Sequence, residues 1–119
     1  MNRMSYREIE LLVIRWAEAR KIIPNSTAAA QAVKTSEEAA ELLEAATVLR
    51  ILKDLGMQGK PVWEHWMGKY RDAVGDIVVT LINGCALADV DLVQCLAEAY
   101  DEIKDRKGTL TPEGIFVKE

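Results

Sequence analysis

The long stretch from Ala28 to Leu55 constrains the fold most, because it contains no residue that breaks a helix. Neither Gly nor Pro occurs in it, and Ala, Leu and Glu make up most of its residues. These three residue types are among the strongest helix formers. The stretch therefore predicts one long helix, against which the rest of the chain has to pack.

Most of the remaining chain also has helical periodicity, with apolar residues recurring at spacings of three and four. Three further helices are expected, over residues 5–21, 69–88 and 89–107, with a short helical turn at 62–67. Ser5 and Glu8 have the spacing of a capping box. Gly108 is expected to end the last helix in the left-handed conformation, and the sequence after it predicts a short extended tail or hairpin. We expect one all-α domain over residues 1–119, a bundle of about four helices.

Charge and hydropathy exclude two classes of partner. The 119 residues carry a formal net charge of −4, whereas a nucleic-acid-binding protein needs a basic surface to displace counterions from phosphate. No apolar run approaches the length that crosses a bilayer, and the N-terminus has no apolar core of signal-peptide length. We therefore expect a cytoplasmic protein with neither nucleic acid nor membrane as partner.

Acidic residues are concentrated in the middle of the long helix. Glu37, Glu41 and Glu44 fall on one stripe, and Glu38 lies three residues before Glu41. Carboxylates at these spacings repel one another, and Lys34 is the one cation within a turn of them. Such a run is compatible with a solvated helix face, but it also matches a set of oxygen ligands for a cation.

A second acidic pair, Asp72 and Asp76, lies on the following long helix. The apolar run 77–82 comes directly after Asp76, and a carboxylate beside a core needs a partner that neutralises it. Lys or Arg could neutralise one such group, whereas several converging carboxylates suit Mg²⁺, a hard cation that binds oxygen. The pair could alternatively be a solvated or capping feature. Two acidic helices expected to pack antiparallel favour the metal site.

At these residues the chain resembles the MazG-like nucleotide pyrophosphohydrolases of the all-α nucleoside triphosphate pyrophosphatase superfamily. The family pattern is Glu-Glu-x-x-Glu, a spacer and then Glu-x-x-Asp, which is similar to Glu37-Glu38-x-x-Glu41 and the later Gly75-Asp76. The ending, residues 99–108 and 114–119, looks like that of the short MazG-like proteins of phages and mobile elements.

The resemblance implies an activity and a set of ligands. Family members hydrolyse ribo- or deoxyribonucleoside triphosphates between the α and β phosphates, releasing a monophosphate and pyrophosphate. It implies Mg²⁺, or Mn²⁺ in its place, held by Glu38, Glu41 and Asp76, with Glu37 as a further ligand. Glu37 or Glu38 is also expected to orient or deprotonate the attacking water. Asp72 is an additional candidate ligand.

Further residues are expected to meet the nucleotide. Lys34 lies a turn before the acidic motif, so it is a candidate for binding phosphate. The family's Asn-x-x-Lys is similar to Asp101-Glu-Ile-Lys104, so the resemblance also implies Lys104 and Asp101 as candidates for binding the phosphates of the nucleotide. Trp16 is a candidate for stacking on the base, with core packing as its alternative. Asn83 is a candidate for hydrogen bonding to the sugar or base, with a structural role as its alternative.

Two positions depart from the family pattern. The Glu expected three residues before Asp76 is Ala73, and Asp101 replaces an Asn. The sequence therefore leaves two other functions open. One is a helical nucleotide-binding or protein-interaction module without catalysis, and the other is a structural oligomer. The resemblance itself implies an enzyme that forms a homodimer or a dimer of dimers.

Overall fold

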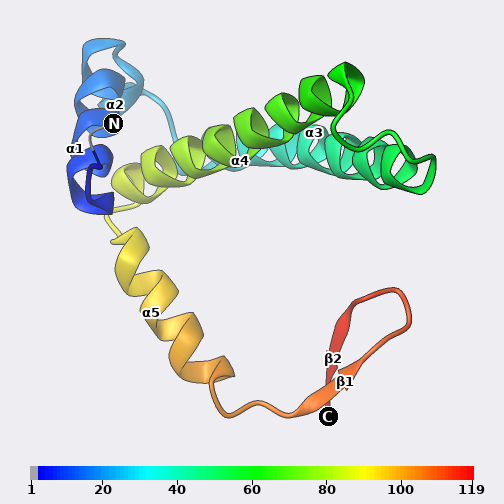
Figure 1. The fold of residues 1–119 in the computed structure, drawn as a ribbon. Helices are drawn as coiled ribbons and strands as arrows, with labels where there is room; N and C mark the ends of the chain where they lie inside the picture. The colour runs from blue at the N-terminus through cyan, green and yellow to red at the C-terminus, as the bar shows by residue number, and fades with distance from the viewer. Residues whose placement is uncertain (1–2) are drawn as a thin grey trace. The chain divides into compact units, whose positions relative to one another are not determined.

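The computed structural model describes residues 3–119, and over these residues the chain is mostly helical. Contacts divide the chain into two compact units, Met1–Asp89 and Val90–Glu119. The first unit contains helices α1 to α4, and the second contains helix α5 and the strands β1 and β2 (Figure 1). The all-α prediction is confirmed for the described part of the chain.

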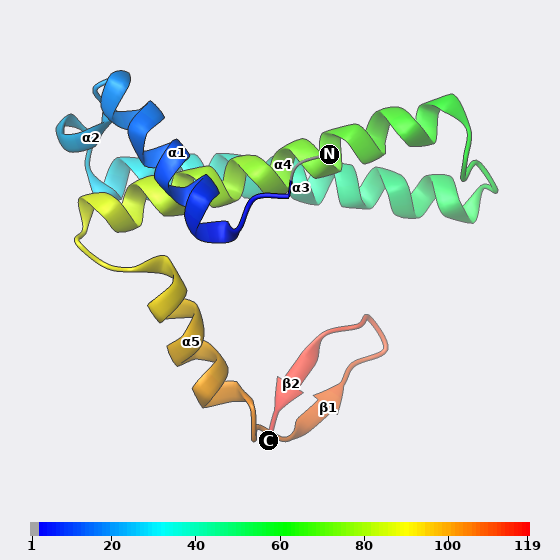
Figure 2. The ribbon, with the colours of Figure 1, turned by 60° about the vertical axis from the view of Figure 1, so that its left-hand side comes forward.

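A long hairpin of two helices forms the body of the first unit. α3 (Ala28–Asp54) and α4 (Pro61–Leu87) lie side by side along their length (Figures 1 and 2). The Thr27 side chain caps α3 by accepting a hydrogen bond from the Ala30 backbone N–H at 3.0 Å. Gly56 and Gly59, both with positive φ, make the turn between the helices, a conformation that costs glycine little.

α4 begins earlier than the sequence predicts. Residues 62–67 were expected to form a separate short turn, but they belong to the same uninterrupted helix. Pro61 takes the first position of α4, where its fixed φ suits a helix and its missing N–H costs nothing. The proline that reads as a breaker is therefore the start signal of the helix that carries Asp72 and Asp76.

α1 (Tyr6–Ala19) and the short α2 (Ile22–Asn25) pack against α4. The predicted capping box is present: Ser5 Oγ accepts from the Glu8 N–H, and Glu8 Oε1 accepts from the Ser5 N–H, each at 3.2 Å. Ala17, on the inner side of α1, is fully buried. This packing brings the α1 side chains beside the part of α4 that follows Asp76.

The core is narrow. The buried hydrophobic residues in the described part of the chain are Ala17, Ala45, Leu49, Ala73 and Ile82. Three of them are alanines, which let helices approach closely but bury little apolar area. Buried Thr80 and Asn83 lie on α4 among them, so the seam between α3 and α4 has polar as well as apolar contacts.

The second unit consists of α5 (Leu92–Ile103) followed by a hairpin. Asp91 caps α5 by accepting a hydrogen bond from the Val93 N–H at 2.9 Å. β1 (Gly108–Leu110) and β2 (Phe116–Lys118) pair antiparallel, with Thr109 opposite Val117. The C-terminal hairpin is thus confirmed.

The predicted role of Gly108 is wrong. α5 ends at Ile103 rather than near Lys107, and Gly108 belongs to β1 without a positive φ. A Cβ at Gly108 would overlap the Val117 carbonyl oxygen and the Phe116 ring. The glycine is therefore needed for the close approach of the two strands, not for ending a helix.

Among the described residues, no single helix combines the length and the apolar content needed to cross a membrane, and α4 and α5 reach them only as an interrupted pair.

Candidate functional site

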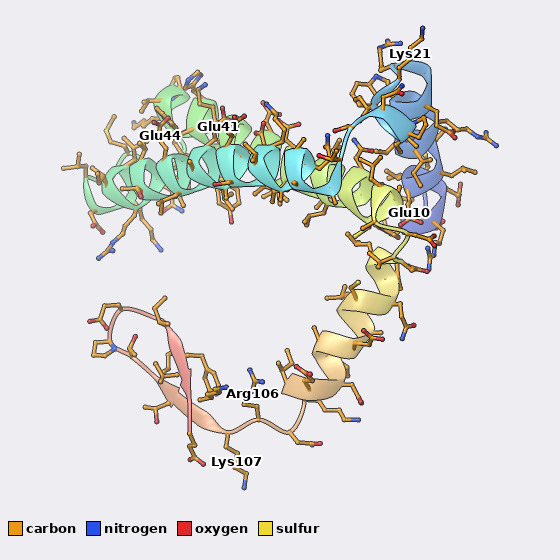
Figure 3. The ribbon with its side chains drawn as sticks, turned by 180° about the vertical axis from the view of Figure 1, so that it is seen from behind. Glu10, Lys21, Glu41, Glu44, Arg106 and Lys107 are labelled. Carbon is orange, nitrogen blue, oxygen red and sulfur yellow. The ribbon has the colours of Figure 1, made fainter. Side chains whose placement is uncertain are left out.

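Carboxylates from α3 and α4 meet in one pocket of the first unit, which we call the acidic pocket. Glu41 and Glu44 lie three residues apart on α3, on the same face of the helix (Figure 3). Asp72 and Asp76 come from α4, one turn apart. The lining is Glu41, Glu44, Trp66, Lys69, Asp72, Ala73 and Asp76. The structure therefore brings together the two acidic groups that lie about thirty residues apart in sequence.

Glu38 is the most perturbed carboxylate of this region. Its side chain is half-buried, and its Oε2 is shielded from solvent without a hydrogen-bond partner among the described residues. Side-chain hydrogen bonding with the Glu41 carboxyl group raises the pKa of Glu38, and desolvation and the charges of Glu41 and Asp76 raise it further. These effects disfavour the ionised form of Glu38 relative to that of an isolated glutamate.

Glu37 lies in different surroundings from its neighbour. Its carboxylate forms a 2.8 Å ion pair with Lys34 Nζ, and both side chains are more than half exposed. Hydrogen bonding to Glu37, followed by the charge of that carboxylate, raises the pKa of Lys34. Successive helix residues point about 100° apart, so Glu37 faces solvent while Glu38 faces the seam between α3 and α4.

A second hollow, which we call the mixed pocket, lies beside the first and combines apolar and polar walls. Its lining comes from α1, α2, α3 and α4: Trp16, Ile22, Gln31, Lys34, Glu38, Asp76, Val79, Thr80 and Asn83. Trp16 is 46% exposed, so it lines the pocket rather than filling the core. Asn83 is only 2% exposed, and its Oδ1 has no hydrogen-bond partner in the described chain.

Asp76 lines three hollows of the first unit. It lines the acidic pocket, the mixed pocket and an apolar groove along α1 formed by Met4, Ile9, Leu12, Val13, Trp16 and Val79. A group bound at Asp76 can therefore be reached from carboxylates on one side and from Trp16 and Asn83 on another. The walls around Asp76 are therefore acidic on one side and largely apolar on another.

The carboxylates around Asp76 are the right type of ligand for a hard divalent cation, but they do not form a complete coordination shell. No three His, Cys, Asp or Glu side chains in residues 3–119 stand close enough together to hold a metal ion as they are placed. However, the unpartnered Glu38 Oε2 and the neighbouring side chains of Glu41 and Asp76 offer oxygen ligands, and these carboxylates would repel one another when all are ionised. Carboxylate oxygens are the ligands that Mg²⁺ prefers, so the type of donor and the local excess of negative charge both suit it.

Two other predicted nucleotide-binding residues lie in the second unit. Lys104 Nζ forms a 2.8 Å ion pair with Asp101 on α5, and Arg106 and Lys107 follow in the connection to β1 (Figure 3). The role of Lys104 and Asp101 at phosphate stays a prediction.

Comparison of the chain with protein-family models, with curated proteins and with solved structures finds no match. The resemblance to the MazG-like enzymes therefore depends on the motif residues themselves.

The sequence did not single out several residues that shape these pockets. Thr35 and Thr80 form a 2.7 Å hydrogen bond between α3 and α4. No pattern in the sequence indicates that these two residues are in contact. Lys69 lines the acidic pocket and lies 5.8 Å from the Trp66 ring centre. Its position three residues before Asp72, on the same helix face, could have indicated this.

Proposed function

We propose that the protein is a Mg²⁺-dependent nucleoside triphosphate pyrophosphohydrolase of MazG-like type, folded as a MazG-like helical bundle. It would cleave ribo- or deoxyribonucleoside triphosphates between the α and β phosphates. The convergence of carboxylates from α3 and α4 on Asp76, beside a pocket with an aromatic wall, is the observation that carries the proposal. The family motif at Glu37, Glu38 and Glu41 supplies the reaction class.

In this proposal, Glu38, Glu41 and Asp76 hold the metal, and Glu37 and Asp72 are further candidate ligands. Bound Mg²⁺ supplies neutralisation of the charge that develops on the departing pyrophosphate. Glu38 or Glu37 positions the attacking water and takes its proton. Glu38 suits this task better, because it lines the mixed pocket together with Asp76, whereas Glu37 is more than half exposed and pairs with Lys34.

Lys34 has a supporting role at the edge of the mixed pocket. It is 54% exposed and pairs with Glu37, so its ammonium group can turn toward a phosphate without leaving a buried charge behind. A triphosphate carries more charge than a single carboxylate and attracts Lys34 more strongly. We expect Lys34 to exchange Glu37 for phosphate when a nucleotide binds.

The test is pyrophosphate release from a panel of nucleoside triphosphates, with Mg²⁺ and with EDTA. Pyrophosphate and monophosphate should appear in equal amounts with Mg²⁺ and be absent with EDTA. Glu38→Gln and Glu41→Gln should each lower kcat by at least about 100-fold. Glu64→Gln, an equivalent change in the first turn of α4 away from both pockets, should leave the rate within about twofold.

Thermal denaturation with and without Mg²⁺ separates the alternatives. Mg²⁺ should raise Tm in the wild type, since a ligand that binds only the folded state stabilises it, and Asp76→Asn should abolish the rise. A folded protein that releases no pyrophosphate contradicts the proposed activity. An unchanged Tm as well leaves only a structural role for the carboxylates.

One observation favours a second candidate function, a nucleotide-binding or protein-interaction module that has lost catalysis. Ala73 stands where the family pattern has a glutamate, and it is 2% exposed in the wall of the acidic pocket. A ligand expected there is thus replaced by a methyl group. Nucleotide-induced stabilisation without any turnover would select this alternative.

A further inference from the structure

The C-terminal hairpin is a two-stranded sheet with both edges open. Within the described chain, β1 and β2 pair with no third strand (Figure 2), and neither contacts α5 of the same unit. Its large apolar side chains are all more than half exposed, namely Leu110, Ile115, Phe116 and Val117. A two-stranded hairpin is at best marginally stable in water, and a sheet of three or more strands is needed for stability. Another strand at one edge would therefore stabilise this hairpin.

The backbone hydrogen bonds of the hairpin show which groups of β2 are free to pair. The Ile115 carbonyl oxygen accepts a hydrogen bond from the other arm of the hairpin at 2.7 Å, and the Glu119 N–H donates to that arm at 3.0 Å. Hydrogen-bonding direction alternates along a strand of an antiparallel pair. Phe116 and Lys118 therefore direct their backbone N–H and C=O groups away from β1, toward the open edge.

The open edge of β2 is better suited to a further strand than that of β1. Pro112 comes two residues after Leu110, where the next outward N–H of the β1 side would lie, and proline has no N–H to donate. Proline at an edge is a common protection against pairing. The β2 side instead has the run 115–117, Ile-Phe-Val, whose residue types favour strands.

Charge selects one register for pairing β2 with its own copy about a twofold axis. Outward-facing residues have to lie opposite one another, so the axis passes beside one of the three residues of β2. An axis at Lys118 places this lysine opposite its own copy, and an axis at Phe116 places Glu113 opposite Glu119 of the second copy. Like charges directly opposite are destabilising. An axis at Val117 creates no such pair, because Phe116 then lies opposite Lys118.

We propose that β2 pairs antiparallel with β2 of a second copy of this chain, centred on Val117, so that the two hairpins form one four-stranded sheet. The backbone groups of Phe116 in each copy hydrogen-bond with those of Lys118 in the other. The aliphatic part of Lys118 covers the Phe116 ring of the second copy, while its ammonium group stays in water. Val117 packs against its own copy. The interface belongs to the second unit and is independent of the proposed enzyme activity.

Cysteine cross-linking tests the register. In a Cys85→Ser, Cys95→Ser background, Val117→Cys places two thiols opposite each other in a non-hydrogen-bonded pair. Their Cα atoms would lie about 4.5 Å apart, within the range that disulfides span. Thr109→Cys is the matched control, because Thr109 lies opposite Val117 on the other strand of the hairpin. In the four-stranded sheet it would be three strand spacings, about 14 Å, from its copy.

Under a mild oxidant, Val117→Cys should form a disulfide-linked dimer at least about tenfold faster than Thr109→Cys. Comparable rates in the two variants, or no linked dimer in either, would overturn the inference.

Amide hydrogen exchange of the wild-type protein, followed by NMR, tests the pairing without any substitution. The N–H groups of Phe116 and Lys118 should exchange at least about tenfold more slowly than that of Leu110, because Leu110 faces outward on the unpaired edge of β1. Equal exchange at all three would show that β2 has no neighbour, and slower exchange at Leu110 would place the contact on β1. Either result would refute the pairing. Neither experiment uses nucleotide or Mg²⁺, so its outcome leaves the proposed enzyme activity to its own test.

Discussion

Ala73 occupies a position in the acidic pocket at which the family pattern has a carboxylate. It is buried on α4 in the pocket wall that also contains Asp72 and Asp76. Ala73→Glu should lower the free energy of unfolding by more than about 2 kcal/mol in EDTA, because it adds bulk and a negative charge beside other carboxylates. Mg²⁺ should recover much of this loss, since a cation turns the added carboxylate from a repelled group into a ligand. Chemical denaturation with and without Mg²⁺ measures both effects.

Ala73→Gln is the control for Ala73→Glu, because it adds the same bulk without the charge. Its loss of stability should be independent of Mg²⁺. An identical Mg²⁺ response in the two variants would contradict a cation site at the acidic pocket.

Tyr6 shows how a single hydroxyl makes stability depend on pH. Its O–H donates to Glu10 Oε2 at 2.7 Å, and Glu10 also pairs with Arg7 at 2.8 Å. Desolvation, followed by the hydrogen bond to Glu10, raises the pKa of Tyr6 above its usual value of 10.0. The folded state therefore keeps this proton where the unfolded state loses it, so the contribution to stability is present below pH 10 and is lost as the pH rises further.

Tyr6→Phe should cost about 1 kcal/mol of the free energy of unfolding at pH 7, the worth of one partly buried hydrogen bond. The variant should also lose less stability than the wild type when the pH rises above 10, because it lacks the titrating group. Urea denaturation across this range compares the two proteins. Parallel pH profiles would show that Tyr6 does not donate to Glu10 in solution.

The two helices of the hairpin are joined by the hydrogen bond between Thr35 and Thr80. Thr80 is 8% exposed, and the bond lies one turn from both Glu38 and Asp76. Thr80→Val keeps the shape but removes the hydroxyl, and it should lower the free energy of unfolding by about 1 kcal/mol. Thr47→Val is the matched control, because the exposed Thr47 hydroxyl bonds only the Leu43 carbonyl oxygen of its own helix. Equal losses in the two variants would mean that the bond between the helices contributes nothing measurable.

Element boundaries were predictable where one local signal decides them. The start of α1 followed from the Ser5 and Glu8 capping box, and α3 followed from the absence of breakers between Thr27 and Gly56. The start of α4 was missed because Pro61 can either stop or begin a helix, and only the packing of α4 along α3 decides between these. Gly108 was misread because its reason is a close approach to β2, which is a contact distant in sequence.

Helical spacing alone could predict which site residues share a face of one helix, but not which of them meet residues of another helix. Spacing placed Glu41 and Glu44 on one stripe, and the structure puts both in the acidic pocket. It grouped Glu37 with them, although Glu37 instead pairs with Lys34 at the surface. The orientation of α3 against α4 decides this, and it depends on how all the side chains of both helices pack. The unpartnered Asn83 amide is likewise a property of the tertiary structure.

At the scale of the whole protein, few large apolar side chains are buried and many are exposed. Three of the five buried hydrophobic residues in the described chain are alanines, whereas Leu43, Leu55 and Leu96 are each more than two-thirds exposed. Small domains bury a low fraction of their surface and often need a partner for stability, and large exposed apolar patches mark interaction surfaces. These exposures agree with the homodimer or dimer of dimers that the MazG-like motif implies, which remains a prediction.

Self-association should be visible as a mass of about two or four times the chain's 13.3 kDa in light scattering at micromolar concentration. Tm should rise with protein concentration, because association stabilises the folded state by mass action. Leu43→Lys, which places a charge at a side chain 69% exposed on α3, should lower the mass if this face is the interface. Lys53→Gln, which changes the charge in the last turn of the same helix, should leave the mass unchanged. A mass of one chain together with a concentration-independent Tm would contradict assembly, and the small core alone would then have to stabilise the fold.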